Sequence, residues 1–515
     1  MCGILCEICY TNTKCCSTSL LRRIQNRGPN CMQTVEVMSG TDCTIGFCGS
    51  VLWMQGQQLT PQPLENEKGI LLYNGDVLDE TWTSDVSDTQ IIMDKLCQQT
   101  VKVLKSLKGP FSLIYFDKST QVLYFSRDRI GRSTLLFHGN ENSFQLDFNE
   151  DIIDLSDEVR IHLTTHLNKI RTFASLKSVF LLQGDIIGYI ESTAKGTINK
   201  SEIMRQLSTH TVIHGVMMKV TELLEKSVRI RLKRQPHKCK VCLQNDTLEC
   251  NHCTVGVLFS GGLDCTILAL LADKYLLEHQ SIDLINIAFK KDDKSTYDVP
   301  DRLTGRQSYA ELMRICPSRK WAFKEVDVPK DELKNFQVTT IADLVYPRQT
   351  ILDESLGSAL WFAARGEDNK TTSSCRVLLL GSGADELFGG YTRHRNAYKR
   401  KGWPGLAREL LLDWKRISFR NLSRDNRVIC DHGRQPRMPY LDEDFTEYVL
   451  QLKPCEHLGP GIGDKLILRL VAFNLGLTDA ANIPKRALQF GSRIANNKEK
   501  GSDKSGTFLG PINRY

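Results

Sequence analysis

The first 190 residues consist mainly of short hydrophobic runs separated by glycine, asparagine and aspartate. Runs of this length, rich in Val, Ile, Leu, Phe and Tyr, are typical of strands that end in polar turns. We predict strands within TIGFCGSVLW (44–53), GILLYNGDV (69–77), GPFSLIYFD (109–117), QVLYFSRD (121–128) and STLLFHG (133–139). The stretch SDTQIIMDKLCQQT (87–100) has helical spacing instead. This region therefore predicts an α+β domain of layered sheet with few helices.

The hydrophobic pattern changes after residue 254, where strand-like runs alternate with amphipathic helical segments. The runs are TVGVLF (254–259), IDLINIAF (282–289), WAFKEVDV (321–328) and RVLLLG (376–381). Such alternation is typical of an α/β parallel sheet with helices on both faces. Residues 395–490 are expected to be mostly helical, which gives this domain a helical C-terminal part.

Length and pattern together predict two domains joined by a linker. A chain of 515 residues is too long for one compact core. We assign 2–190 to the first domain, 191–253 to a linker with one helix over 212–234 and a cysteine-rich segment, and 254–495 to the second domain. The polar tail over 496–515 is expected to be poorly ordered.

Charge and hydropathy exclude several classes of partner. The net charge of +7 is small for this length, and no block of like charges predicts nucleic-acid binding. The start of the chain does not resemble a signal peptide, and no run of about 18 apolar residues predicts a membrane span. We therefore expect a cytoplasmic protein, whose 18 cysteines serve as thiols, metal ligands or a nucleophile rather than disulfides.

The segment VGVLFSGGLDC (255–265) joins a buried strand to a helix through a serine and two glycines. Gly261 and Gly262 allow a tight turn in which backbone N–H groups and the helix N-terminus face one point, and Ser260 adds a hydroxyl. This geometry suits a phosphate. Asp264 beside that phosphate indicates a bridging Mg²⁺. The alternative is a tight turn in which the glycines only avoid steric clashes.

A second strand, loop and helix occur in RVLLLGSGADELFGGY (376–391). Asp385 and Glu386 follow the strand, where ligands of open parallel sheets usually bind. Asp385 could therefore share Mg²⁺ with Asp264. The alternative is that these acids only cap the first turn of a helix.

Four cysteines immediately before the phosphate loop have the spacing C-x2-C-x7-C-x2-C. They are Cys239, Cys242, Cys250 and Cys253. Two CxxC pairs can place four thiolates around Zn²⁺, so we predict a structural zinc site. An unstructured cysteine-rich loop, or a redox or cluster role, are the alternatives. His237 and His252 flank the cysteines and could substitute as ligands.

The two acidic loops resemble known ATP sites. SGGLDC is similar to the SGGxDS loop of ATP-pyrophosphatases, and GSGADELFGGY is similar to the GEGxDExFxGY loop of glutamine-dependent asparagine synthetases, with Ser382 in place of the acid. The segments at 420–445, 463–473 and 483–492 continue this resemblance, and those at 299–312, 345–366 and 423–443 narrow it to one branch of the family. It implies that Lys465 approaches the α-phosphate of ATP.

The start of the chain, MCG, resembles a type-2 glutamine amidotransferase of the N-terminal nucleophile hydrolase class. If Met1 is removed, Cys2 combines a nucleophilic thiol with its own α-amine as base. The resemblance implies that Asn74 and Gly75 form the oxyanion hole and that Asp88 binds the α-ammonium of glutamine. The family's arginine for the glutamine carboxylate has no counterpart, since no arginine occurs between Arg27 and Arg127.

The resemblance as a whole implies a glutamine-hydrolysing asparagine synthase. Such an enzyme makes asparagine from aspartate, glutamine and ATP with Mg²⁺, through a β-aspartyl-adenylate. The missing arginine and Ser382 leave two alternatives: a catalytically impaired nucleotide-binding or scaffold protein, or a ligase for a different carboxylate. The sequence does not predict an oligomeric state.

Overall fold

The fold consists of two compact units, which are described separately. The first contains Met1–Asn168, Arg234–His237 and Ile429–Gln435, and the second contains Lys169–Lys233, Lys238–Val428 and Pro436–Tyr515. The computed structural model describes residues 2–10, 18–39, 43–82, 85–136, 139–140, 143–144, 154–156, 159–163, 189, 192–193, 199–236, 238–245, 250, 252–292, 294–452, 458–459, 463–495 and 500–508.

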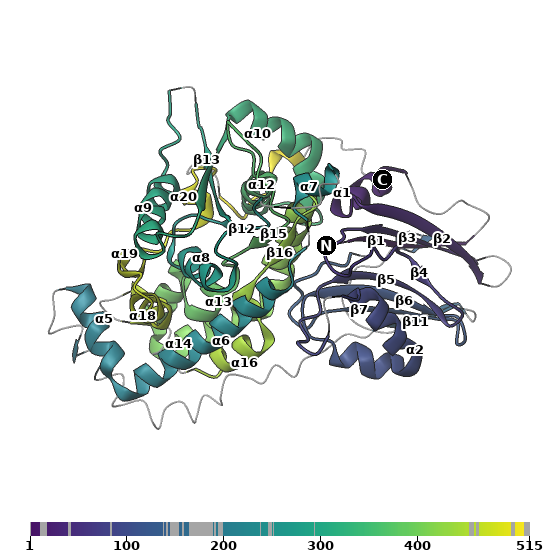
Figure 1. The fold of residues 1–515 in the computed structure, drawn as a ribbon, viewed down its shortest axis with the longest axis horizontal. Coiled ribbons are helices and arrows are strands. Elements are labelled where there is room, and N and C mark those ends of the chain that lie inside the picture. The colour runs from purple at the N-terminus through teal and green to yellow at the C-terminus, as the bar shows by residue number, and fades with distance from the viewer. Residues whose placement is uncertain are drawn as a thin grey trace. The chain divides into compact units, whose positions relative to one another are not determined.

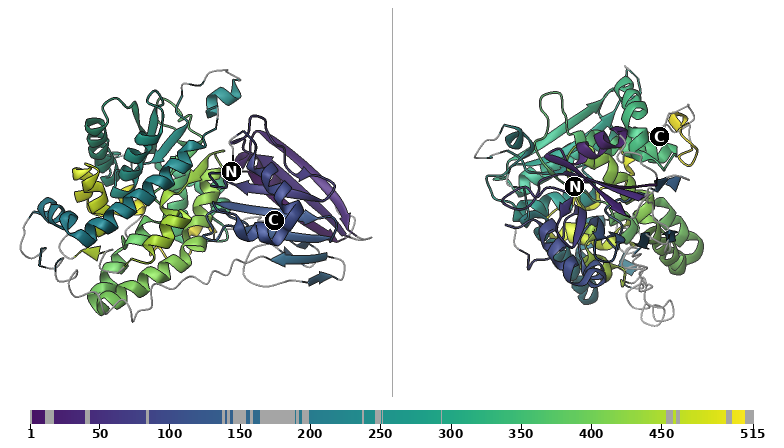
Figure 2. Two further views of the ribbon diagram at one scale, coloured as in Figure 1. Left: turned by 60° about the horizontal axis from the view of Figure 1, so that its bottom comes forward. Right: turned by 90° about the vertical axis from the view of Figure 1, so that its right-hand side faces the viewer.

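Two sheets form the centre of the first unit (Figures 1 and 2). One has the strand order β2-β3-β1-β9-β8 and the other the order β10-β11-β7-β6-β5-β4. The first sheet contains β1 (Gly3–Tyr10), β2 (Cys31–Ser39), β3 (Cys43–Val51), β8 (Gly139–Asn140) and β9 (Ser143–Phe144). The second contains β4 (Leu64–Glu65), β5 (Gly69–Gly75), β6 (Phe111–Asp117), β7 (Val122–Arg127), β10 (Asp154–Ser156) and β11 (Val159–Leu163).

Strands β5 and β6 of the second sheet are buried on both faces, which explains their nearly continuous hydrophobic runs. Alternate residues of a strand point to opposite faces. On β5, Ile70 and Leu72 pack with Phe47 of the other sheet, whereas Leu71 and Tyr73 pack against helix α2 (Asp88–Ser106). Helix α1 (Thr18–Arg27) lies against β1 and β3. Helices thus cover both outer faces of the paired sheets (Figure 1), the layered arrangement that the strand-rich pattern predicts.

One predicted strand of this unit is wrong. Residues 133–136 of STLLFHG form a loop instead of a strand. The buried Asp128 organises this loop, because its carboxylate accepts hydrogen bonds from the backbone N–H groups of Ile130, Gly131 and Ser133 and from Arg132 Nε. These interactions satisfy backbone groups that would otherwise need a strand partner.

A parallel sheet forms the centre of the second unit, as predicted. Its strand order is β14-β13-β12-β15-β16. β12 pairs in parallel with β13 and β15, and β13 pairs in parallel with β14. The carboxyl ends of β12 and β15 therefore lie next to each other and position the two acidic loops. The strands are β12 (Val255–Leu258), β13 (Ile282–Phe289), β14 (Trp321–Val328), β15 (Val377–Leu379) and β16 (Gln435–Arg437), with a separate hairpin of β17 (Leu458–Gly459) and β18 (Gly463–Asp464).

Helices surround this sheet and form the rest of the unit, and α8, α9 and α12 contact its strands. Among the described residues, the helices before the last strand are α5 (Lys200–Thr209), α6 (Thr211–Lys233), α7 (Lys240–Gln244), α8 (Leu263–Tyr275), α9 (Pro300–Ile315), α10 (Lys330–Phe336), η1 (Gln337–Ile341), α11 (Ala342–Val345), α12 (Ile351–Arg365), α13 (Ala384–Phe388), α14 (Thr392–Ile417), η2 (Ser418–Leu422) and α15 (Ser423–Cys430). Those that follow it are η3 (Pro439–Leu441), α16 (Glu443–Val449), α18 (Leu466–Asn474), α19 (Thr478–Asn482), α20 (Leu488–Gly491) and η4 (Gly506–Phe508).

Helix α6, which the sequence assigns to a linker, is an integral part of the second unit. It contacts α8, α16 and α18 of that unit. Its apolar face is buried through Met217, Val220, Leu224 and Val228. A helix that covers this much apolar surface stabilises the unit through the hydrophobic effect, so it is not a free connection.

The described part of the tail, residues 500–508, is ordered, in contrast to the expected disorder. The first N–H groups of a helix have no acceptor within the helix. At α12, Ile351 N donates to Asp503 O and Leu352 N donates to Gly501 O, each at 2.9 Å. The buried Ser505 also donates to Glu354 Oε2 at 2.6 Å. The tail therefore caps α12.

No helix in the described part of the chain is both long enough and apolar enough to cross a bilayer.

Candidate active sites

The predicted phosphate loop connects β12 to α8 through Ser260, Gly261 and Gly262. Gly261 has a φ of 76°, and a Cβ at this position would lie 2.4 Å from Gly305 N. Only glycine fits here without moving the backbone. Gly262 is the N-cap of α8 and donates to Ser260 Oγ at 3.3 Å. The loop therefore presents a helix N-terminus, which favours an anion.

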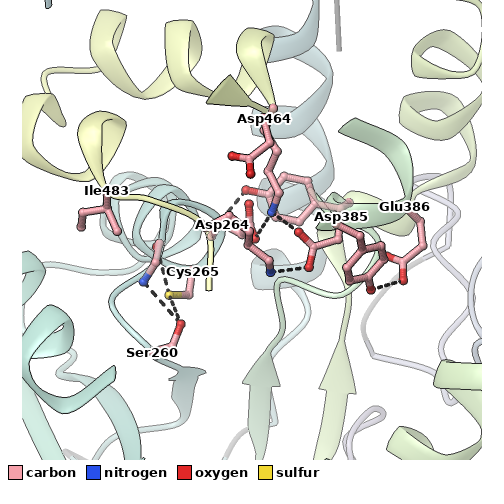
Figure 3. A network of polar contacts seen from close by, with 12 residues as sticks. Ser260, Asp264, Cys265, Asp385, Glu386, Asp464 and Ile483 are labelled. Carbon is pink, nitrogen blue, oxygen red and sulfur yellow. Dashed lines mark hydrogen bonds and ion pairs between the residues drawn. The ribbon is translucent and has the colours of Figure 1, made fainter. Parts of the chain in front are cut away.

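Lys465 joins the two acidic loops. Its Nζ lies 2.5 Å from Asp264 Oδ2 and 2.5 Å from Asp385 Oδ1, and Asp385 also pairs with Lys485. Figure 3 shows how the side chains of Asp264 and Asp385 approach each other from the two loops. Residues more than 200 positions apart in the chain thus form one buried cluster of alternating charge.

Electrostatic attraction within this cluster favours the charged forms of its side chains despite their burial. Burial alone raises the pKa of Asp385, but the positive charges of Lys465 and Lys485 hold it well below its ordinary value. Burial opposes the charge of Lys465, yet Asp264 and Asp385 raise its pKa well above its ordinary value. Lys465 also has a left-handed φ of 56°. Backbone strain of this kind at a residue other than glycine is concentrated at functional sites.

The cluster also fits a divalent cation. Asp264 Oδ1 is buried and has no hydrogen-bond partner among the described residues. Carboxylate oxygens are the ligands that Mg²⁺ prefers, and it usually takes one or two of them together with substrate phosphates. Asp264 thus offers a free carboxylate oxygen to such a cation, whereas both oxygens of Asp385, the other predicted ligand, pair with lysines.

A pocket of 820 Å³ lies at the carboxyl ends of β12 and β15. This volume is within the range of sites for nucleotide-sized ligands. Ser260, Asp264, Ser382 and Asp385 line one part of it. Ser382, at the position where the similar loop of glutamine-dependent asparagine synthetases has an acidic residue, is half-buried in this pocket.

Another wall of this pocket carries positive charge that the sequence analysis did not identify. Arg416 and Arg420, four residues apart, line it from the end of α14 and from η2. Residues at this spacing lie on one face of a helix. Both side chains are half-buried, and among the described residues neither guanidinium has an acidic partner. The two arginines therefore provide a site for an anionic group of a ligand.

Glu386 has a supporting role beside the metal-binding candidates. Its Oε1 accepts hydrogen bonds from Tyr391 Oη at 2.6 Å and from Asn421 Nδ2 at 2.7 Å. Burial, together with the charge of Asp385, raises its pKa. Because two donors already occupy the oxygen, Glu386 connects the loop after β15 to η2.

A smaller cavity of 50 Å³ lies beside the phosphate loop. Gly262 lines it together with four cationic side chains, those of Lys465, Arg469, Lys485 and Arg486, so the N-terminus of α8 lies beside a cationic wall. Asp301 faces the same cavity, and burial raises its pKa to about 7, despite the charges of Arg486 and Lys485. This positive environment suits a polyphosphate.

In the first unit, Cys2 is buried, with 9% of its surface exposed. Burial raises the pKa of its thiol. Gln62 Nε2 lies 3.7 Å from Cys2 Sγ, and Gln62 Oε1 accepts a hydrogen bond from Tyr73 N at 2.7 Å. The cavity that Cys2 lines has a volume of 30 Å³, enough for one or two water molecules. Its lining includes no arginine or lysine among the described residues.

Asp88 and Gly75 line the same small cavity as Cys2, as the resemblance implies. Tyr73 Oη donates to Asp88 Oδ2 at 3.1 Å. Burial and the nearby charge of Asp76 raise the pKa of Asp88 to about 7. Asp88 is therefore only partly ionised at neutral pH in this closed form of the site.

Asn74 adjoins these residues but does not present a free donor. Its Nδ2 donates to Ser112 Oγ at 3.3 Å and to Ser133 Oγ at 3.2 Å. Its Oδ1 is buried and has no partner among the described residues. A half-turn of the amide would let the two hydroxyls donate to Oδ1 and would make Nδ2 available for an oxyanion.

The structure brings together a group of four candidate ligand atoms that differs in one member from the predicted set. The ligand atoms of Cys239, Cys242, Cys250 and His252 all lie within 4.8 Å of one another. Cys253 is outside this group, because its Sγ points into the unit and donates to Val255 O at 2.9 Å. His237, the other histidine considered from the sequence, lies outside the described residues.

Three residues that line these pockets were missed in the sequence analysis, and only one of them lies in a recognisable motif. Lys485 lies in IPKRALQFGS, a segment already noted for its resemblance, but lysines are exposed by default. Arg416 and Arg420 belong to a helical region without a motif. Only the folded chain shows that both line the 820 Å³ pocket, Arg416 from the end of α14 and Arg420 from the π-helix η2.

Family models match both halves of the chain. A model described as "Glutamine amidotransferase domain" matches residues 1–198. A model described as "Asparagine synthase" matches residues 251–404 and 398–479. The first matched region contains the residues that line the Cys2 cavity, and the second contains Asp264, Asp385 and Lys465.

Similar curated proteins cover almost the whole chain. An asparagine synthetase domain-containing protein of Drosophila melanogaster is 37% identical over 98% of this chain and 100% of its own length. Asparagine synthetase domain-containing protein 1 of Homo sapiens is 30% identical over 98% of this chain and 97% of its own length. A putative glutamine-hydrolysing asparagine synthetase of Methanocaldococcus jannaschii is 24% identical over 77% of this chain and 67% of its own length. The chain therefore belongs to the family of asparagine synthetase domain-containing proteins.

Proposed function

We propose that this protein is an ATP-dependent amide-forming ligase that makes asparagine from aspartate, with glutamine as the nitrogen donor. The observation that carries the proposal is the buried cluster in which Lys465 contacts both Asp264 and Asp385 beside the 820 Å³ pocket. Such a cluster costs desolvation free energy and is a weak way to gain stability, so a role in chemistry explains it better.

The proposal assigns the polyphosphate of ATP to the phosphate loop. The N-terminus of α8, with Ser260, Gly261 and Gly262, binds the β- and γ-phosphates, and Lys465 contacts the α-phosphate. Lys485 and Arg486 line the adjoining cavity and neutralise the pyrophosphate. Mg²⁺ held by Asp264 and Asp385 would supply further stabilisation of the charge on the phosphates.

Arg416 and Arg420 are suited to bind the carboxylate substrate. Guanidinium groups bind carboxylates through paired hydrogen bonds, and two of them match a dicarboxylic acid such as aspartate. In the reaction, a carboxylate oxygen attacks the α-phosphorus of ATP and pyrophosphate leaves. Ammonia then attacks the carbonyl carbon of the adenylate, AMP leaves, and the nitrogen loses a proton.

The first unit would supply that ammonia. The α-amine of Cys2 takes the thiol proton while the sulfur attacks the side-chain carbonyl carbon of glutamine. The same amine returns the proton to the nitrogen, ammonia leaves, and water hydrolyses the thioester to glutamate. Gly75 N–H and the Asn74 amide would stabilise the oxyanion. A cavity of 30 Å³ does not accommodate glutamine, so substrate binding requires movement of the residues that line it.

Three assays on the full-length protein test the proposal. We expect aspartate-dependent exchange of labelled pyrophosphate into ATP, release of glutamate from glutamine, and formation of asparagine. Cys2→Ala should abolish the use of glutamine and retain the use of free ammonia. Absence of both pyrophosphate exchange and glutamate release would refute the proposed function.

Arg420→Ala is expected to raise the KM for aspartate by about 10- to 100-fold, because a charged hydrogen bond contributes about 1.5–3 kcal/mol. The KM for ATP should change little. Steady-state kinetics with varied aspartate measure the effect. Arg408→Ala, an exposed arginine of the preceding helix α14, is the matched control. Equal aspartate KM values in the two variants would contradict this assignment.

Glutamate release is expected to depend on pH through Asp88. Its folded-state pKa is raised to about 7, so the ionised form that binds an ammonium group is populated above that pH. The kcat/KM for glutamine should therefore rise with pH up to about 7 through this group. Asp88→Asn should lower kcat/KM by about 10- to 100-fold and remove this part of the profile.

Asp85→Asn, an exposed carboxylate nearby in the chain, is the control for that profile. It should behave as the parent protein at each pH. If Asp88→Asn keeps the same rise below pH 7, another group causes it and the role of Asp88 is wrong.

The closed Cys2 cavity favours a second candidate, a nucleotide-binding protein that does not use glutamine. No cation lines that cavity within the described chain, although a free carboxylate normally requires one. ATP binding without pyrophosphate exchange or glutamate release would favour this candidate. Exchange that depends on another carboxylic acid would instead indicate a ligase with a changed substrate, to which Ser382 could contribute.

A further inference from the structure

We propose that Cys239, Cys242, Cys250 and His252 bind one structural Zn²⁺ ion, with His252 as the fourth ligand in place of Cys253. The inference is independent of the proposed ligase activity. It rests on the arrangement of four ligand atoms from two short segments, Cys239–Cys242 and residues 250–252, which lie within 4.8 Å of one another.

The geometry of the first two cysteines is suited to metal binding. Cys239 is the N-cap of α7, and its Sγ accepts a hydrogen bond from Cys242 N at 3.3 Å. The backbone turn thus directs both side chains to one side of the segment. An N–H donor also stabilises the negative charge of a thiolate ligand.

The second segment completes the set from the opposite side. Cys250 Sγ accepts a hydrogen bond from Cys239 N at 3.4 Å. His252 Nδ1 lies 3.2 Å from Cys242 Sγ. In a tetrahedral zinc site, Zn–S bonds of about 2.3 Å and Zn–N bonds of about 2.0 Å place neighbouring ligand atoms less than 4 Å apart. The four atoms need only small movements to reach that geometry.

The direction of the chain explains why His252 and not Cys253 belongs to the site. Cys253 lies two residues before β12, and its buried side chain donates to Val255 O at 2.9 Å. His252, one residue earlier, points the opposite way and is exposed. Side chains of consecutive residues in an extended chain alternate in direction.

The location indicates a structural role. Lys240 N donates to Ser374 O and Ser374 Oγ donates to Cys253 O, each at 2.9 Å, so the cysteine segment adjoins the start of β15 as well as β12. The phosphate loop lies at the other end of β12, a strand of four residues, about 13 Å away at 3.3 Å per residue. Three cysteines and one histidine also fill a tetrahedral site and leave no position for substrate.

Disulfides do not explain this cluster. None of Cys239, Cys242, Cys250 and Cys253 forms a disulfide. Three thiolates at one place would repel one another, whereas Zn²⁺ compensates their negative charge. Zinc would thereby fix the segment that connects α6 to β12.

The test is metal analysis of the full-length protein, purified from zinc-supplemented cells without a metal-affinity step. We expect about one zinc per chain in the parent protein. His252→Ala should bind Zn²⁺ at least about tenfold more weakly, and Cys250→Ser should show a similar or larger loss. Competition with a chromophoric zinc chelator measures the affinities.

Cys253→Ser is the matched control, because serine is nearly isosteric and can still donate to Val255 O. It should retain zinc with the affinity of the parent. Cobalt substitution provides a second readout, since the visible spectrum of tetrahedral Co²⁺ should change in His252→Ala and remain unchanged in Cys253→Ser. Circular dichroism checks that each variant is folded. Because His252 is exposed, His252→Ala should fold normally, and a loss of zinc would then report the loss of a ligand.

Two kinds of result would overturn the inference. A parent protein with well under one zinc per chain, or with iron in its place, would exclude a zinc site. Loss of zinc in Cys253→Ser together with parental affinity in His252→Ala would show that the fourth ligand is Cys253.

Discussion

Lys465→Met is expected to reduce ATP-dependent turnover by at least about 10²–10³-fold and to destabilise the second unit by about 3–5 kcal/mol. The ammonium group of Lys465 is 2.5 Å from the carboxylates of both Asp264 and Asp385. Methionine keeps most of the side-chain volume but leaves the two acids without their shared cation in a buried site. Pyrophosphate exchange and chemical denaturation measure the two effects.

Two comparisons separate the local cause from a general loss of charge. Lys274→Met removes an exposed lysine that pairs with Glu225 at 2.8 Å, and it should cost at most about 1 kcal/mol. Adding Asp264→Asn to Lys465→Met should recover part of the stability, because it removes one unpaired charge, although activity stays low. If Lys465→Met is as stable as Lys274→Met, the buried charge cluster is not present in solution.

Gly261→Ala is expected to destabilise the second unit by about 2–4 kcal/mol and to abolish measurable ATP binding. The new Cβ would lie 2.4 Å from Gly305 N and 2.5 Å from Gly305 Cα, both backbone atoms that cannot turn away. The φ of 76° adds conformational strain. The phosphate loop must therefore move away from α9. Thermal unfolding and ATP titration measure the outcome.

Gly262→Ala is the matched control one residue later. Its Cβ would have only Ser260 Oγ nearby, at 3.3 Å, and its φ of −69° is accessible to alanine. Its effect on stability should stay below about 1 kcal/mol. If both substitutions destabilise the protein to a similar extent, contact with Gly305 is not the reason why position 261 requires glycine.

Much of the local structure followed from the sequence because it depends on neighbouring residues. The run GILLYNG predicts β5, and SDTQIIMDKLCQQT predicts α2, since burial on one or both faces imposes a periodic pattern. STLLFHG is as rich in apolar residues as the run that forms β5. Hydrogen bonds to the buried Asp128 nevertheless hold its described part as a loop. Composition does not reveal such a competing partner.

The candidate sites were predictable to different extents. Ser260, Gly261, Gly262 and Asp264 are close in the chain, so their arrangement follows from one strand, turn and helix. The fourth ligand at the cysteine cluster did not follow from spacing, because Cys253 and His252 are adjacent and only the direction of each side chain distinguishes them. A shift of one residue reverses that direction.

The sequence by itself determined which chemical groups the protein has and their local settings: a cysteine at position 2, a glycine-rich turn before a helix, and two acidic loops after strands. Only the tertiary structure decided which of these groups meet. It places Lys465 against Asp264 across 201 positions of sequence, adds Arg416 and Arg420 to the 820 Å³ pocket, and closes the cavity at Cys2 to 30 Å³. The reason is physical: local propensity acts over a few residues, whereas ion pairing and cavity volume depend on how distant segments pack.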